Sequence, residues 1–307
     1  MSNDRPVLGI LLMLGFCILA PFGDAVAKLL GETIPLVQLL LVRFAVQAAL
    51  LLPIVVLARR LWRMRGRILR LAILRTLLHI AGIGAMFTAL RYLPLADAVA
   101  IAFVMPFILL LLGKTLLNEE IGRRRMLACI VGFTGALLVI QPSFAAIGWP
   151  ALWPLAVAVI FAFFILVTRQ LARDTDPIGL QAFSGVFATL VLLPVVLLGR
   201  YSALPALGLV VPDAREWLLL LTIGGLGTLA HLLMTWSLRF APAATLAPMQ
   251  YLEIPAATAV GWLIFRDLPG LLAGVGILIT IAAGLYVVMH ERSIARLARA
   301  RVLKAPL

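Results

Sequence analysis

The chain has 307 residues, of which 64% are hydrophobic and only 13% are charged. A soluble domain of this length needs a polar surface that such a composition cannot supply. The net charge of +13 would suit a nucleic-acid partner, but Lys and Arg gather in short loops between apolar blocks, as topogenic charges do, so we expect no nucleic-acid binding.

The apolar residues form blocks of about 20, the length that a helix needs to cross a hydrocarbon core of about 30 Å. The blocks are continuously apolar and do not alternate with a period of two, which excludes a β-barrel. We therefore predict an all-α integral membrane protein with ten transmembrane helices. In chain order, the predicted spans are residues 6–27, 34–58, 71–90, 95–113, 126–141, 148–168, 178–199, 216–238, 243–265 and 270–289.

The loop charges predict the orientation of these spans. If the N-terminus is cytoplasmic, 19 of the 26 Lys and Arg residues lie in inside segments and five in outside segments. An excess of Lys and Arg marks the cytoplasmic side. We expect a multi-pass protein of a bacterial cytoplasmic (inner) membrane with both termini in the cytoplasm.

The two halves of the chain resemble each other. Pro53 and Arg59 match Pro194 and Arg200 at one constant offset. Residues 90–96 match residues 238–244 at a slightly larger offset, which indicates a short insertion in the second half. The prediction is two five-helix repeats, residues 1–142 and 143–307. Because five is odd, matched helices face opposite sides of the membrane, and such inverted repeats are common in secondary transporters.

Several short motifs occur in the same order in both halves. In the first half they are Pro35, Arg43, Leu90-Arg91-Tyr92-Leu93-Pro94, Pro106 and Asn118-Glu119-Glu120-Ile121, and in the second half Leu238-Arg239-Phe240-Ala241-Pro242, Pro255 and Phe265-Arg266-Asp267. This order and spacing resembles the EamA group of ten-helix permeases in the drug/metabolite transporter superfamily. Asp267-Leu268 departs from the acidic pair of the first half, and Ser184 stands where the first half has Arg43. The resemblance implies transport but names no cargo.

A charge near the bilayer centre costs about 2.5–3.5 kcal/mol on insertion scales, so each one calls for a reason. Arg43 is an anchor for an anionic substrate group or a structural arginine bonded to the carbonyls of helix ends, which the resemblance favours. Arg75 and His79 share a face of the third span. Arg75 is a candidate for substrate binding or coupling, with snorkelling to the nearby cytoplasmic end as the alternative. His79 either binds substrate or protons, or makes an interhelical hydrogen bond.

Glu253 is the most informative candidate, because its repeat partner is the apolar Met105. It either couples transport to protons and binds substrate, or forms a structural ion pair. Pro255 nearby frees backbone groups of the kind that line discontinuous transporter helices. Further candidates for substrate binding or coupling are Gln250, Tyr251, His231, Trp236 and Met105. Asp24 and Lys28 are expected to neutralise each other on the first span.

These observations predict a secondary active transporter that moves a small organic metabolite, an amino acid or related compound, out of the cell by alternating access with proton coupling. No nucleotide-binding loop occurs, and we expect no cofactor and no metal. A lipid or lipid-carrier flippase is the alternative. A membrane-embedded enzyme is disfavoured, because neither His-Glu-x-x-His nor Gly-x-Ser-x-Gly occurs in the sequence.

Overall fold

A computed structural model of the protein describes residues 5–59, 64–117, 122–140, 148–199, 201 and 204–266, with short stretches between 271 and 293. Every regular element within these ranges is helical. The acidic motif at 118–121 and the dipeptide at 267–268 lie outside the described residues.

Six helices are long and apolar enough to cross a membrane by length and composition. They are α1 (Pro6–Leu30), α2 (Leu36–Leu57), α3 (Gly66–Leu90), α8 (Leu152–Asp174), α9 (Pro177–Gly199) and α10 (Ala214–Phe240). The shorter helices are α4 (Leu95–Ala102), α5 (Met105–Leu117), α6 (Arg123–Ile140), α11 (Ala243–Gln250) and α12 (Glu253–Phe265), with the single 3₁₀ turns η1 (Trp149–Ala151) and η2 (Pro205–Leu207). Six of the ten predicted spans are therefore present as single long helices.

Two predicted spans are broken, which corrects the expectation of continuous helices over 95–113 and 243–265. α4 ends before Phe103 and Val104, and α11 ends before Tyr251 and Leu252. A proline follows each break. Pro106 and Pro255 lack an N–H, and their rings crowd the carbonyl four residues earlier, which favours an interruption at these positions. Proline alone does not decide it, because Pro21, Pro53 and Pro194 lie inside the unbroken helices α1, α2 and α9. Tighter i→i−3 hydrogen bonds, such as Val104 N to Ile101 O and Leu252 N to Met249 O, satisfy the backbone there.

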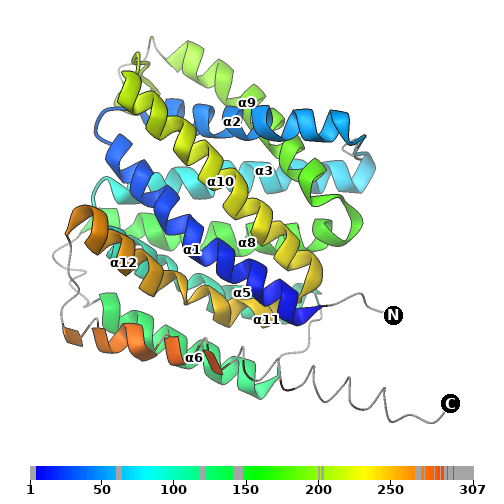
Figure 1. The fold of residues 1–307 in the computed structure, drawn as a ribbon, viewed down its shortest axis with the longest axis vertical. Helices are drawn as coiled ribbons and strands as arrows, with labels where there is room; N and C mark the ends of the chain where they lie inside the picture. Colours follow the sequence, from blue (N-terminus) through cyan, green and yellow to red (C-terminus); the bar gives the residue numbers. More distant parts are fainter. Residues whose placement is uncertain are drawn as a thin grey trace.

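The helix boundaries repeat along the chain. α4 and α11 begin at matched positions, Leu95 and Ala243, and α5 and α12 begin at the same offset from each other. The packing repeats as well: α1 packs on α10, the matched helix α8 packs on α3, and α2 packs on α9 (Figure 1). α1 and α3 therefore each pack on the counterpart of the other, and α2 packs on its own counterpart.

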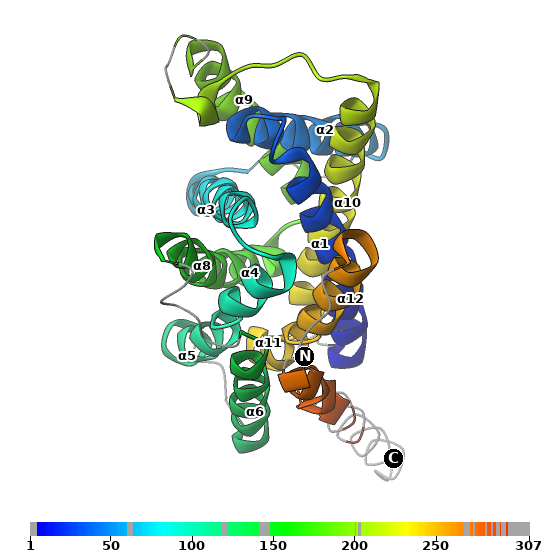
Figure 2. The ribbon, with the colours of Figure 1, turned by 90° about the vertical axis from the view of Figure 1, so that its left-hand side faces the viewer.

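Turned by 90°, the ribbon shows two layers of helices (Figure 2). One layer holds α1, α10 and α12, and the other holds α3, α8 and α5. The short helices join them, because α4 packs on α12 and α8, and α11 packs on α5 and α1. The main hydrophobic core lies between the layers.

Basic side chains join matched helix ends. Lys28 Nζ on α1 donates a hydrogen bond to Leu93 O, just beyond α3, at 2.7 Å. Arg169 Nη1, at the matched position on α8, donates to Leu238 O near the end of α10. These contacts place the C-terminal ends of α1 and α3 at one end of the bundle, and those of α8 and α10 together.

Candidate functional site

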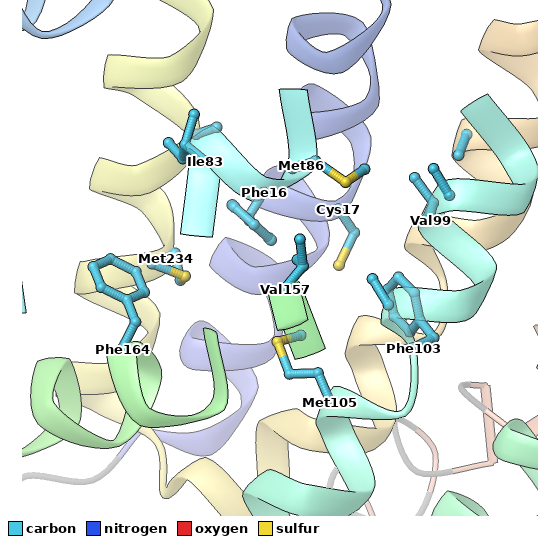
Figure 3. Packing of buried hydrophobic residues seen from close by; sticks show 14 of the residues in the cluster. Phe16, Cys17, Ile83, Met86, Val99, Phe103, Met105, Val157, Phe164 and Met234 are labelled. Atoms are coloured by element: carbon cyan, nitrogen blue, oxygen red, sulfur yellow. The ribbon is translucent and has the colours of Figure 1, made fainter. Parts of the chain in front are cut away.

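A cavity lies between the two layers, with a volume of about 830 Å³ including the part open to solvent. Its wall receives side chains from α1, α2, α3, α4, α5, α8, α10, α11 and α12. Both helix breaks contribute, through Phe103 and Met105 at the first and Gln250 and Glu253 at the second. Figure 3 shows Phe16, Met86, Met105 and Val157 on different helices around this region, with Phe103 in the break between α4 and α5.

The cavity lies toward one end of the bundle. Asp24 and Phe87 are near the C-terminal ends of α1 and α3, and Arg43 and Val157 are in the N-terminal halves of α2 and α8. The ends of α1 and α3 lie together, because Lys28 near the end of α1 donates to Leu93 O just beyond α3.

The wall is built from matched positions of the two repeats. Phe16, Ala20 and Asp24 line it together with Val157, Phe161 and Ile165, their respective counterparts at the offset that relates Pro53 to Pro194. Ile83, Met86, Ala102 and Met105 line it together with His231, Met234, Gln250 and Glu253, their respective counterparts at the offset that relates Leu95 to Ala243. The cavity therefore lies where the two repeats meet.

Arg43 reaches the cavity from α2 and is only 3% exposed. Its guanidinium lies 4.9 Å from the ring centroid of Phe44 and directly against Gly227 of α10. Nη1 has no hydrogen-bond partner among the described groups. The Asp24 carboxylate interacts with Arg43 electrostatically. Arg43 thus lines the cavity and holds a buried donor that has no partner among the described groups.

Asp24 corrects a prediction. The expected neutralising pair with Lys28 is replaced by other contacts: Lys28 donates to Leu93 O, and Asp24 lines the cavity. One feature of the sequence indicates that Asp24 faces the same side of α1 as other cavity residues. Phe16, Ala20 and Asp24 are spaced by four residues and so share one face of α1. Nothing in the sequence distinguishes the aromatic residues of the cavity wall, such as Phe161, from ordinary core residues.

Gln250 and Glu253 flank the second break, as the last residue of α11 and the first of α12. Gln250 is fully buried, and neither its amide nitrogen nor its oxygen has a hydrogen-bond partner among the described groups. Glu253 interacts electrostatically with another acid, Asp24. A structural ion pair at Glu253, the alternative interpretation, finds no basic partner among the residues that the structure describes.

His79 and His231 lie at different distances from the cavity. His231 lines the cavity, and its ring centroid lies 4.2 Å from that of His79. His79 is fully buried behind it, stacked 4.6 Å from Phe164 and edge-on to Phe44 at 5.1 Å. His79 therefore supports the wall rather than forming it.

Arg75 is a second correction. It is fully buried and does not snorkel, because α3 begins at Gly66 and places it nine residues into the helix. Its Nε donates to Thr168 Oγ1 at 2.9 Å and its Nη1 to Ser184 Oγ at 2.8 Å. Its Nη2 donates to Gln181 Oε1 at 3.0 Å and to Thr235 Oγ1 at 3.4 Å. This network joins α3 to α8, α9 and α10 away from the cavity.

Two candidates also lie outside the cavity wall. Tyr251 packs its ring against Gly132 of α6 and 5.6 Å from Phe103. Trp236 packs on a small apolar cluster of α2, α9 and α10 that includes Leu51. The structure thus brings together Arg43, Met105, His231, Gln250 and Glu253, and it leaves Arg75, His79, Tyr251 and Trp236 around them.

The sequence model of the EamA-like transporter family matches residues 7–141 and again residues 148–289. This chain belongs to the EamA-like transporter family. With its apolar helices, membership makes the protein a multi-pass membrane protein of the drug/metabolite transporter superfamily. A crystal structure with 19% sequence identity superposes with a TM-score of 0.71 over 94% of this chain and 99% of the other, which supports the fold alone.

Relatives with assigned cargo include transporters of different solutes. A riboflavin transporter of Brucella anthropi is 28% identical over 74% of this chain and 79% of the relative. An S-adenosylmethionine uptake transporter of Rickettsia prowazekii is 24% identical over 88% of each chain. A pseudopaline exporter of Pseudomonas aeruginosa is 30% identical over 66% of each chain. This protein is therefore similar to small-molecule transporters that differ in cargo and direction.

Proposed function

We propose that this protein is a secondary active transporter that exports a small organic metabolite, an amino acid or related compound, across the bacterial cytoplasmic membrane. The observation that carries the proposal is the cavity wall built from matched residues of the two repeats, such as Met86 with Met234 and Met105 with Glu253. A site at the junction of two repeats can be exposed to either side when the repeats rock against each other.

The proposed architecture is ten transmembrane helices in two inverted five-helix repeats, residues 1–142 and 143–307. The helix packing supports it. α8 is the counterpart of α1 and α10 is the counterpart of α3, so the contact of α1 with α10 and the contact of α8 with α3 join equivalent helices. Both termini are proposed to be cytoplasmic. In that orientation the cavity lies nearer the outer face, and the Arg75 network lies between it and the cytoplasm.

Proton coupling is proposed to use the acids of the cavity, Glu253 and Asp24. A carboxylate held out of water is costly to keep charged, so its charge can change with the occupancy of the site. Export is the proposed direction, and similarity to the pseudopaline exporter supports it. Similarity to an uptake transporter supports the opposite direction, so flux must be measured both ways.

The test is solute flux in proteoliposomes. Purified protein should exchange a labelled amino acid across the vesicle membrane and accumulate it against a gradient when a pH gradient is imposed. Lipid scrambling is measured in the same vesicles. Scrambling without solute flux would contradict the proposal and favour a lipid flippase.

A further inference from the structure

Matched positions of the two repeats line the cavity, but they differ in chemistry. Each polar residue at a matched position has an apolar counterpart: Asp24 matches Ile165, and Glu253 matches Met105. Likewise His231 matches Ile83, and Gln250 matches Ala102. The duplicated fold therefore supplies equivalent positions, and only one member of each pair carries a polar group.

These polar groups gather on one side. The polar wall comprises Asp24, Arg43, His231, Gln250 and Glu253, from α1, α2, α10, α11 and α12. The cavity residues of α3, α4, α5 and α8 are all apolar, and they form an apolar wall that includes Met86, Phe87, Met105 and Phe161. α1, α10 and α12 form one layer of the bundle, and α3, α5 and α8 form the other (Figure 2). The cavity thus has a polar layer and an apolar layer facing each other.

The polar wall holds charges of both signs. Arg43 offers a guanidinium whose Nη1 is buried without a partner, and Gln250 offers an amide whose nitrogen and oxygen are both free of partners among the described groups. Asp24 and Glu253 offer carboxylates that interact with each other. Buried polar groups normally have hydrogen-bond partners, so unpartnered polar groups on side chains that line a cavity indicate groups reserved for a ligand.

Building on the proposed transport function, we infer that the cavity selects a zwitterionic amphiphile: an amino-carboxylate whose body is apolar and preferably aromatic or thioether-like. The carboxylate binds Arg43, and the ammonium binds Glu253 with Asp24 beside it. The apolar body lies against Met86, Met105 and Phe161. Arginine suits a carboxylate because its planar fork donates two parallel hydrogen bonds, and aromatic and thioether groups make favourable contacts with each other.

The experiment uses the purified full-length protein in detergent and a matched set of probes. L-phenylalanine carries both charges and the aromatic body. 3-Phenylpropionate lacks the ammonium, L-phenylalaninamide lacks the carboxylate charge, and L-alanine lacks the aromatic body. Ligand-induced thermal stabilisation, titrated for each probe, gives an apparent Kd. We expect L-phenylalanine to bind about tenfold or more tightly than 3-phenylpropionate and L-phenylalaninamide, because each of these leaves a buried charged group of the site unpaired. We expect a similar advantage over L-alanine, because L-alanine buries far less apolar surface.

Two substitutions then assign the charges. In Glu253→Gln the preference for L-phenylalanine over 3-phenylpropionate should disappear, while its preference over L-phenylalaninamide remains. In Arg43→Gln the preference for L-phenylalanine over L-phenylalaninamide should disappear, while its preference over 3-phenylpropionate remains. The control is Met105→Gln, which places the same amide at the matched position of the apolar wall. This variant should weaken the binding of L-phenylalanine and of 3-phenylpropionate by the same factor, so that the ratio of their apparent Kd values is unchanged.

Equal binding of zwitterionic and singly charged probes, or no binding of any probe, would overturn the inference. So would an unchanged preference in both charge variants. Solute exchange in proteoliposomes separates this failure from failure of the transporter proposal, because a protein that exchanges a solute without an amino-carboxylate group remains a transporter and loses only the inferred substrate class.

Discussion

Gly227 of α10 lies directly against the guanidinium of Arg43 of α2. A Cβ added to Gly227 would come within 2.8 Å of Nη2 and 2.9 Å of Nε, closer than side chains pack. Arg43 can occupy its position at the cavity wall because residue 227 has no side chain. The matched position in the first repeat holds His79, so the two repeats have diverged at this contact.

Substituting Gly227 tests whether the position of Arg43 matters for transport. Gly227→Ala should displace the guanidinium and lower the apparent affinity for the transported solute by about tenfold, since overpacking costs about 1–3 kcal/mol. Solute exchange in proteoliposomes measures it. Gly225→Ala is the matched control, because nothing lies within 4 Å of a Cβ at that position. Equal effects of the two alanines would show that the contact with Arg43 is irrelevant.

Arg43 and Arg75 should respond differently to substitution. Arg75→Gln removes a guanidinium that donates to Thr168, Ser184, Gln181 and Thr235, so it should lower the free energy of unfolding by about 1–3 kcal/mol. Arg43→Gln should leave stability nearly unchanged and reduce solute affinity, and Arg43→Lys should keep part of the transport. Thermal unfolding in detergent and solute exchange are the measurements.

A matching loss of stability in Arg43→Gln and Arg75→Gln would favour a structural role for Arg43, the role that the resemblance suggested. Arg43→Lys helps to separate a structural role from a role in binding an anionic group, because lysine keeps the charge of arginine but not its planar fork of donors.

Much of the fold could be predicted from the sequence, because apolar blocks of about 20 residues and loop charges are local signals. The match between residues 90–96 and residues 238–244 also anticipated equivalent helix starts at Leu95 and Ala243. The helix breaks could not be placed in advance. Prolines such as Pro106 and Pro255 are tolerated in membrane helices, and whether one interrupts the helix depends on its neighbours.

The candidate site was harder to predict, because the depth and direction of a side chain depend on packing. Glu253, Arg43 and Gln250 stood out as polar residues in apolar spans, and all three line the cavity. Arg75 stood out for the same reason, but neighbouring helices satisfy its donors. Asp24 was paired with Lys28 because i,i+4 charges usually interact on an isolated helix. The contact between Lys28 and Leu93 O is not local in sequence.

The predicted topology can be tested with introduced cysteines. In a background without Cys17 and Cys129, which are both buried, Val211→Cys should label with an impermeant maleimide on intact cells. Val211 is 95% exposed in the loop before α10. Leu207→Cys should label too, and so should Phe144→Cys, whose position lies outside the described residues.

The cytoplasmic counterpart is Arg65→Cys, immediately before α3, where the residue is exposed. It should label only after the cells are permeabilised. Labelling of Arg65→Cys from outside, together with protection of Val211→Cys, would reverse the proposed orientation and place the cavity nearer the cytoplasm.

The last prediction concerns coupling through Glu253. This carboxylate begins α12 at the second helix break, is 9% exposed, and interacts with Asp24 on the same wall of the cavity. Two neighbouring acids held out of water disfavour a doubly charged state, so a proton and a substrate ammonium should compete for them.

Glu253→Gln preserves the shape of the side chain and removes its titration. We expect this variant to insert, fold and exchange solute once the concentration compensates for weaker binding, but to lose accumulation driven by a pH gradient. Proteoliposomes with and without that gradient, wild type beside Glu253→Gln and Asp24→Asn, provide the measurement. Gradient-driven accumulation that persists unchanged in Glu253→Gln would remove Glu253 from the coupling mechanism, and its loss in Asp24→Asn would then assign coupling to Asp24.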